Sequence, residues 1–489
     1  MTNEGISSVT RAFCIKLCLA VIFIALCSTF FTGLGINHNN AYAMGVNDGS
    51  VIDKINDYLS DATAKAHFSA TSITVVNKTD VLLSKSYGSC ESTDTPFLLG
   101  SVSKSFTALC IMQLVEQGKI DLDTSIGTYL PNATDGDKIT VRQLLNHTSG
   151  LGEHQNLDNY KIVGKQGVHT YANVNYSLLG KIIEAVSDQS YESYVTENVF
   201  RPLNMSNSAA TLEESVRNGL IDGYENWFGV NVKTKPKFST QSNAWISVPA
   251  GYLTASTSDL GKYLQMYLNG GQGIISRESL DKMFYENVSV DADIPYSYGM
   301  GWTLIDTEPL TQPALRHSGL VETGMTAIYV LPESEIGIAI AVNTNDYFVG
   351  KDLMDRIDWS VALMIMGIEP NQISASEYAT RHLLYDSIYF VALCVSVLPL
   401  CLLRICNKRL GAGNVAVKIV MTVLLHILLP LFLLLLPRIV FSTPLWVVRA
   451  FVPDMFLTIV VSATLLFAGG IVKAILFMLK HTKAWKFKH

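Results

Sequence analysis

Three apolar segments near the carboxyl end constrain this chain more than any other feature of its sequence. They cover residues 387–403, 419–436 and 455–472; none contains Asp, Glu, Lys or Arg, and the second contains His426. Each approaches the roughly 20 residues that an α-helix needs to cross a bilayer. The charged fraction of the chain, 16% against roughly 25% in soluble proteins, agrees with membrane segments. Buried core helices are the alternative, but they would need a large soluble core around them. We therefore predict three transmembrane helices with a short tail over residues 383–489.

Basic residues flank these segments unevenly. The connection 404–413 and the tail after Leu479 are rich in Lys and Arg, whereas the connection between the second and third segments holds only Arg438 and Arg449. Because Lys and Arg collect on the cytoplasmic side of membrane proteins, the first connection and the tail are expected in the cytoplasm. The residues before the first span then form an extracytoplasmic domain of a multi-pass protein of the cell membrane.

The first 43 residues have the pattern of a secretion signal. Arg11 and Lys16 precede an apolar run over residues 17–34, and a small-x-small site follows at 41–43. Because the run is nearly long enough to span a bilayer, an uncleaved signal anchor is the alternative. Both interpretations export the residues that follow.

Residues 44–368 resemble an ordinary water-soluble domain, and a polar connector, 369–382, joins this domain to the first span. Stretches rich in Val, Ile and Thr predict hairpins at 72–86 and 325–343, near both ends of the domain. Predicted helices between them include residues 104–117, 176–186 and 259–269. We expect an α+β fold, with an antiparallel sheet built by both ends, flanking helices and an all-helical subdomain, followed by the α-helical membrane region.

Charge, histidine and cysteine content exclude several classes of function. The formal net charge is −6, and no basic stripe of the kind that binds nucleic acid is present. The ten histidines form no His-Glu-x-x-His or paired-ligand motif, so we predict no metal and no cofactor. Only two of the eight cysteines, Cys90 and Cys110, lie in the domain, and they permit one disulfide without requiring it.

A serine and a lysine one helical turn apart are the first candidates for chemistry. Ser101 and Lys104 open a predicted amphipathic helix, 101–117, which Gly118 ends. Residues three apart share a helix face, so Ser101 Oγ and Lys104 Nζ can meet. The positive end of the helix lies beside the serine, and a desolvated, neutral amine can accept its proton. A Ser-x-x-Lys pattern is common by chance, however, and alone predicts little.

A second short pattern is Tyr171-Ala172-Asn173. The tyrosine can act as a general base if a nearby cation, for which Lys104 is the candidate, lowers its pKa from about 10. Asn173 can hold the lysine and a substrate carbonyl through its amide. Taken alone, this pattern is interpreted by default as a surface turn.

A third pattern, His317-Ser318-Gly319, precedes a predicted strand. On a strand His317 and Gly319 face one way and Ser318 the other. The small Gly319 admits a substrate to the backbone, and the N–H of Leu320 can form an oxyanion hole with the N–H of Ser101. A packed or capping histidine is the default interpretation of His317.

Together, and in this order, the three patterns resemble those of the serine β-lactamase and penicillin-binding protein superfamily, in its class C-like branch. Class A members carry Ser-Asp-Asn at the middle position. Further stretches that resemble the branch are residues 97–107, 114–119, 144–151, 202–205, 249–253 and 298–302. The resemblance covers about residues 50–365 and implies the β-lactamase/transpeptidase-like fold.

The resemblance also implies a role for each matched residue. The catalytic set would be Ser101 as nucleophile, Lys104 as its activator and Tyr171 as base and acid. The substrate-binding set would be Asn173, His317, Ser318 and Gly319. The oxyanion would be held by the backbone N–H groups of Ser101 and Leu320. His147 and Ser149, which belong to a loop typical of the family, are interpreted as structural.

One departure from the family pattern concerns the substrate. His317 stands where many β-lactamases carry Lys, and a histidine is mostly neutral at pH 7. Its grip on a substrate carboxylate is expected to be weaker and dependent on pH. This departure counts against an efficient β-lactamase.

The three predicted spans narrow the resemblance and leave the substrate open. Prodrug-activating peptidases of antibiotic and genotoxin pathways have a similar layout and remove an acyl-D-asparagine cap by cutting an amide, although such enzymes can carry Ser in place of Asn173. We expect a membrane-anchored, extracytoplasmic serine hydrolase that forms an acyl-enzyme on amide or ester bonds, in D-amino-acid-containing peptides. The alternatives are a prodrug-activating N-acyl-D-amino-acid peptidase, a β-lactamase, and a non-hydrolytic penicillin-binding sensor that signals through the spans. The expected partners are a peptide or small-molecule amide and the lipid bilayer, without nucleic acid, and the membrane helices offer a surface for a homo-oligomer.

Overall fold

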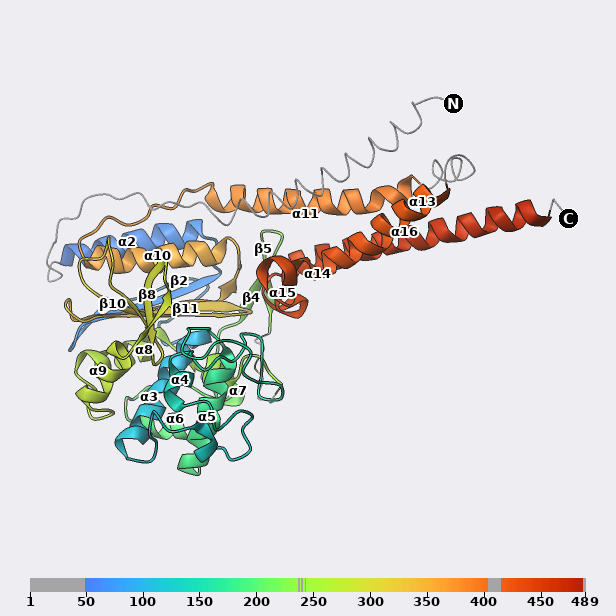
Figure 1. Ribbon diagram of the computed structural model, residues 1–489. Coiled ribbons are helices and arrows are strands. Elements are labelled where there is room, and N and C mark those ends of the chain that lie inside the picture. Colours follow the sequence, from blue (N-terminus) through green and yellow to red (C-terminus); the bar gives the residue numbers. More distant parts are fainter. Residues whose placement is uncertain (1–48, 236–237, 239–240, 242, 403–414, 487–489) are drawn as a thin grey trace.

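A mixed α/β domain and a group of long helices make up the two parts of the molecule (Figure 1). The computed structural model describes residues 49–235, 238, 241, 243–402 and 415–486. The predicted signal, 1–43, and the basic connection, 404–413, lie outside the described residues.

An antiparallel sheet forms the middle layer of the domain. Its strands stand in the order β2-β1-β12-β11-β10-β9-β8-β7, so both ends of the domain meet at its centre, as the two predicted hairpins require. The strands are β1 (Ala70–Val76), β2 (Val81–Gly88), β7 (Val288–Asp291), β8 (Ile294–Gly299), β9 (Trp302–Ile305), β10 (Ala314–Val321), β11 (Gly324–Leu331) and β12 (Ile336–Val342). Strands β1, β11 and β12 are buried along their whole length, and β11 and β12 have a nearly continuous apolar sequence.

Helices cover both faces of this sheet. α2 (Gly49–Lys65) and α10 (Gly350–Ile365) lie on one face, and α8 (Thr257–Leu268) lies on the other (Figure 1). The buried face of α2 repeats apolar residues at helical spacing, as in Ile55 and Leu59, and packs against strand residues such as Ile338. Burying each such side chain stabilises the fold by roughly 1.5–3 kcal/mol. The predicted α+β architecture is confirmed.

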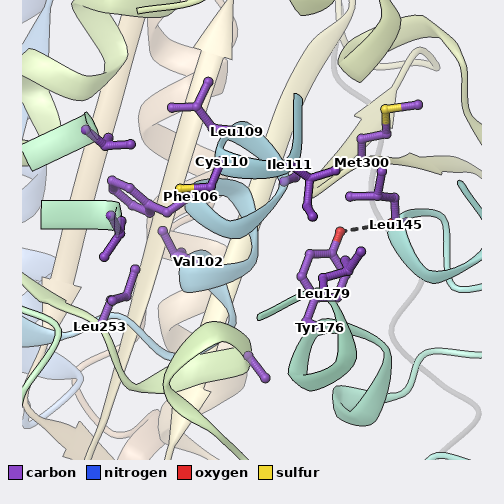
Figure 2. Close-up of a cluster of buried hydrophobic side chains, with 14 of the residues drawn as sticks. Val102, Phe106, Leu109, Cys110, Ile111, Leu145, Tyr176, Leu179, Leu253 and Met300 are labelled. Carbon is purple, nitrogen blue, oxygen red and sulfur yellow. Dashed lines mark hydrogen bonds between the residues drawn. The ribbon is translucent and has the colours of Figure 1, made fainter. Parts of the chain in front are cut away.

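The helical subdomain lies on the α8 side and is built around α3 (Ser103–Glu116). The sequence predicted an amphipathic helix here, but α3 is buried on every side from Ser103 to Leu114. Figure 2 shows its side chains directed to different sides, with Phe106 on one and Ile111 on another. The prediction was wrong because the rest of the domain encloses α3, so that its polar residues are buried together with its apolar ones. Cys110, in this core, and Cys90, in a separate cluster, are buried free thiols, so the permitted disulfide is not formed.

Three helices long and apolar enough to cross a membrane follow the domain. The first is α11 (Glu377–Cys401), which begins inside the predicted connector 369–382. The second is the run α13 (Val415–Val423), η5 (Leu424–Leu428) and α14 (Leu429–Phe441), and the third is α16 (Pro453–Lys486). A short helix, α15 (Leu445–Phe451), connects the second and third spans and lies beside the domain (Figure 1).

Candidate active site

Ser101 and Lys104 lie where a short 3-10 turn passes into the central helix. η1 (Gly100–Val102) leads directly into α3, and Gly100 has a φ of +54°, which glycine adopts without strain. The one-turn spacing brings Lys104 Nζ to 2.9 Å from Ser101 Oγ. The two groups that the sequence singled out therefore touch.

Burial sets the protonation state of Lys104. Its amine also lies 2.8 Å from Asn173 Oδ1 and 2.7 Å from the Ala250 carbonyl oxygen. Desolvation lowers the pKa of Lys104 well below its ordinary value, because the side chain is completely buried. A neutral amine has two N–H groups and one lone pair, and the two carbonyl-type oxygens can only accept. Both N–H groups are therefore used, and the lone pair faces the Ser101 hydroxyl.

Tyr171 lies beside this pair. Its ring centre is 4.8 Å from Lys104 Nζ, and its hydroxyl is close enough to the Ser101 side chain to influence the pKa of the phenol. Burial raises the pKa of Tyr171 above its ordinary value. The expectation that a cation lowers this pKa is wrong, because desolvation of the buried phenol outweighs the influence of its neighbours. Tyr171 keeps its proton in the resting state and is suited to donating it.

Asn173 is the first residue of α5 (Asn173–Ser187) and is buried. Its side-chain oxygen is occupied by Lys104, as described above, which leaves the amide N–H₂ for another acceptor. The short spacing from Tyr171 places both side chains at the amino end of one helix, against Ser101 and Lys104.

His147 positions the segment from Tyr171 to Asn175. From the sequence, His147 was interpreted only as a structural residue of a loop. Its Nδ1 accepts hydrogen bonds from the Ala172 N–H at 3.3 Å and from Asn175 Nδ2 at 2.9 Å. Its ring packs on that of Tyr171, with centroids 4.3 Å apart. Desolvation lowers the pKa of His147, so the ring stays neutral and can accept both bonds. The sequence offered one signal for this role, the run of four polar residues 146–149 before Gly150. All four prove to be buried, which is unusual for polar residues.

The turn before α3 and strand β10 approach each other more closely than side chains allow. A Cβ at Gly100 would lie 2.6 Å from Leu320 N. A Cβ at Gly319 would lie 2.0 Å from Leu99 O and 2.8 Å from Ser101 N. Two glycines therefore permit the backbone at Ser101 and Leu320 to lie side by side.

The edge of β10 is open at this point. β10 pairs with β9 only as far as Arg316, and a two-residue turn joins its last pair with β11, Val321↔Gly324. Hydrogen bonding alternates along an antiparallel strand, so the N–H of Leu320 is directed away from β11, toward Ser101. Two backbone donors thus meet at the amino end of α3, where the helix dipole also favours a negative oxygen.

His317 is buried, and both of its ring nitrogens are engaged within the domain. Nδ1 donates to the Ser318 carbonyl oxygen at 2.8 Å, and Nε2 accepts from the Tyr298 hydroxyl at 3.1 Å. Burial lowers the pKa of His317 to about 3. The predicted pH-dependent grip on a carboxylate is therefore absent at physiological pH, because the ring carries no charge and offers no free N–H. Ser318 is exposed on the other face of β10, as the alternation predicted.

Among the described residues, no group of three or more His, Cys, Asp or Glu is arranged to hold a metal ion. The groups that surround Ser101 are instead an amine, a phenol, an amide and two backbone N–H groups. This arrangement can activate a hydroxyl as a nucleophile and stabilise an oxyanion.

The fold and this grouping define the class of protein: a β-lactamase/penicillin-binding-protein-like α+β domain joined to helices apolar enough to span a membrane. The chain belongs to the beta-lactamase family, whose model, described as "Beta-lactamase", matches residues 55–363. Members and structural neighbours of this family include serine hydrolases such as β-lactamases and amidohydrolases.

Individual relatives are distant. Protein flp of Staphylococcus aureus (strain N315) is 28% identical over 333 residues, which cover 61% of this chain and 64% of that protein. The match thus spans less than two thirds of that relative's length.

Solved structures give a similar picture. The octameric penicillin-binding protein homologue from Pyrococcus abyssi is 28% identical with a TM-score of 0.57, covering 68% of this chain and 80% of that chain. A D-stereospecific amidohydrolase from Streptomyces sp. is 21% identical with a TM-score of 0.50, covering 61% and 94%. A class C β-lactamase is 18% identical with a TM-score of 0.55, covering 66% and 98%. The last two likenesses establish the fold alone.

Gly319→Ala is expected to slow acylation of Ser101 about a hundredfold or more, the usual cost of losing one oxyanion donor. The added methyl would lie 2.0 Å from Leu99 O and would push the Leu320 N–H out of place. The measurement is the rate of labelling by a fluorophosphonate probe. Gly164→Ala is the matched control, because its Cβ would meet nothing closer than 3.5 Å. A folded Gly319→Ala protein that is labelled at the wild-type rate would exclude Leu320 from the oxyanion hole.

The pH profile of labelling is expected to contain no step from His317. Its folded pKa near 3 lies far below the ordinary value, so the ring stays neutral from about pH 5 to pH 8. His317→Gln should therefore change the rate without changing the shape of the profile in this window. Lys104→Arg, whose side chain stays protonated, should be unlabelled at every pH. A wild-type step near pH 6.5 that disappears in His317→Gln would contradict the assignment.

Proposed function

We propose that this chain is a membrane-anchored, extracytoplasmic serine hydrolase that cleaves amide or ester bonds through an acyl-enzyme on Ser101. The observation that carries the proposal is the fully buried Lys104 amine, 2.9 Å from Ser101 Oγ, with its other two partners fixed as acceptors. A lysine held in this way is a base for one particular hydroxyl. The unpaired edge of β10 at Leu320 supplies a backbone N–H that can stabilise the oxyanion formed when Ser101 attacks.

The acylation step follows from these positions. Ser101 Oγ attacks the substrate carbonyl carbon while Lys104 Nζ takes the hydroxyl proton. The carbonyl oxygen becomes an oxyanion between the N–H groups of Ser101 and Leu320. When the C–N or C–O bond breaks, the Tyr171 hydroxyl gives its proton to the leaving group, and the Lys104 ammonium restores the proton of the phenol. Both residues return to neutral forms, in keeping with their burial.

Deacylation reverses the same path with water. Water attacks the ester carbon of the acyl-enzyme and loses a proton to the neutral Lys104 and Tyr171 pair. The tetrahedral intermediate then expels Ser101 Oγ, which regains its proton, and a carboxylic acid is released. Asn173 keeps the Lys104 amine in place in both half-reactions.

The neutral His317 supports a substrate that is not recognised through a carboxylate. A positively charged side chain at this position would attract the carboxylate of a β-lactam, whereas His317 presents a neutral ring whose nitrogens are already engaged. Amides of D-amino acids do not need a carboxylate for recognition, and the Streptomyces structural neighbour is a D-stereospecific amidohydrolase. We therefore propose D-amino-acid-containing peptides as the substrate class, ahead of β-lactams.

The packing of α15 supports the extracytoplasmic orientation. Val447 and Phe451 of this connector belong to the same buried cluster as the core of the catalytic domain. The domain and the connection between the second and third spans must then lie on one side of the membrane. The charge distribution independently predicts that both lie outside the cytoplasm.

Ser101→Ala is expected to abolish covalent labelling by a fluorophosphonate or penicillin probe, because no other hydroxyl is placed against the Lys104 lone pair among the described contacts. Ser187→Ala, which removes a hydroxyl at the far end of α5, is the matched control and should be labelled like the wild type. Retained labelling of the folded Ser101→Ala chain would refute the nucleophile assignment.

A substrate screen of the wild-type chain tests the proposed reaction. N-acyl-D-amino-acid amides, D-Ala-D-Ala peptides, a chromogenic cephalosporin and short esters are compared, and the D-amino-acid amides are expected to turn over fastest. Turnover of the cephalosporin alone would overturn the substrate class. A stable acyl-enzyme that persists for hours without product would indicate a sensor.

Protease added to intact spheroplasts is expected to cut the chain near Gln241, which is exposed on the catalytic domain. A tag placed after His489 should resist the protease until the membrane is opened, because the tail is predicted to be cytoplasmic. Protection at Gln241 together with cleavage of the tag would reverse the proposed topology.

A further inference from the structure

The connector α15 is attached to the sheet half of the catalytic domain. Asn345, in β13 (Thr344–Asn345), donates from Nδ2 to the Phe451 carbonyl oxygen at 3.2 Å. Phe228, which follows β4 (Gly223–Trp227), donates its N–H to Asp454 Oδ2 at 3.2 Å. β13 and β4 pair with each other, so the two contacts hold the end of α15 and the start of α16 to one small sheet.

The other side of α15 contacts the helical half of the domain through aromatic rings. The Trp446 ring lies 5.3 Å from the Trp245 ring and 6.3 Å from the His154 ring, both in edge-to-face geometry. Phe451 contacts Trp245 in the same way, at 6.0 Å. Trp245 also stacks on His154, at 5.6 Å. One membrane connector therefore bridges the two halves of the domain, and the candidate active site lies between those halves.

Trp245 ties together the two loops that lead to the site. Its Nε1 donates to the Glu153 carbonyl oxygen at 2.8 Å, and Glu153 follows directly on the loop that contains His147. The residue after Trp245, Ile246, packs tightly against Gly251. A Cβ at Gly251 would lie only 2.6 Å from Ile246 Cγ2. The intervening helix η4 (Val248–Tyr252) contains Ala250, whose carbonyl oxygen holds the Lys104 amine.

These contacts form a short path from the membrane connector to the catalytic amine. Trp446 fixes Trp245, Trp245 fixes the start of η4, and η4 fixes the acceptor that leaves the Lys104 lone pair to Ser101. A displacement of this acceptor by a fraction of an ångström would turn the amine away from the hydroxyl, and misplacement of about 1 Å can cost on the order of a hundredfold in rate.

We propose that α15 is a positioning element of the active site, with Trp446 as its contact residue, so that the membrane-spanning part of the chain sets the geometry of Lys104. This inference rests on the proposed acyl-enzyme function. Trp446 touches no reacting group and acts through Trp245. Because Trp446 is 47% exposed, its truncation removes the ring contact without opening a cavity in the core.

The test measures acylation of the full-length chain, in membranes or detergent, as a function of the concentration of a fluorophosphonate probe. Trp446→Ala is expected to lower the maximal rate constant about tenfold, leaving the half-saturating probe concentration and the final labelled fraction unchanged. Trp446→Phe should recover most of the rate, because an aromatic ring is restored. Arg449→Ala, at an exposed position of the same helix, is the matched control and should behave as the wild type.

A double substitution tests the route of the effect. If Trp446 acts through Trp245, then Trp245→Ala and the double variant with Trp446→Ala should be equally slow, since the second change removes nothing further. If the fold-reductions in rate of the two single variants multiply in the double variant, the route through Trp245 is overturned.

The remaining outcomes separate this inference from the proposed function. A wild-type rate in Trp446→Ala, or a reduced labelled fraction at an unchanged rate, would overturn the positioning role while leaving the acyl-enzyme function intact. Failure of the wild-type chain to be labelled at all would remove the proposed function and this inference with it.

Discussion

The arrangement around Ser101 depends on one buried amine. Lys104 Nζ is the point at which three separate elements meet: α3 carries it, α5 supplies Asn173 Oδ1 and η4 supplies the Ala250 carbonyl oxygen. Burying an ammonium ion without a counter-charge is costly, and the neutral amine avoids that cost while keeping both N–H groups bonded. The same neutrality makes it a base. The burial of Lys104, its satisfied hydrogen bonds and its proposed role as a base therefore all depend on the neutral form of the amine.

Burial favours the uncharged form of the groups around this amine. It depresses the pKa of Lys104, His147 and His317 and raises that of Tyr171. Negative charge that develops on a substrate would be stabilised by backbone N–H groups and by the end of a helix, not by a side-chain cation. Such a site favours carbonyl compounds over anions, which agrees with the proposed preference for amides.

The domain is held to its membrane helices by specific polar contacts. His382 on α11 is 2.8 Å from Asp346, just after β13, and Tyr378 on the same helix donates its hydroxyl to the Gly229 carbonyl oxygen. Together with the contacts of α15, these bonds act at the ends of two different spans. The α+β domain is therefore positioned by the C-terminal apolar helices, in contrast to a domain on a flexible tether.

Local patterns in the sequence were enough to predict the three apolar helices, the two terminal hairpins and the meeting of Ser101 with Lys104. Each of these follows from local periodicity: apolar length, alternation in strands, and the three-residue helical spacing. The expected sheet and the family resemblance already brought the two ends of the domain together and Ser101 near Leu320. The register of β1 on β12, the enclosure of α3 and the distance between Gly100 and Gly319 came from the folded structure. They join segments far apart in the chain, and no local pattern encodes the distance between them. The protonation states belong to the same group, because the pKa of Tyr171 or His317 is set by how much water the folded chain excludes, and a residue's identity does not contain that information.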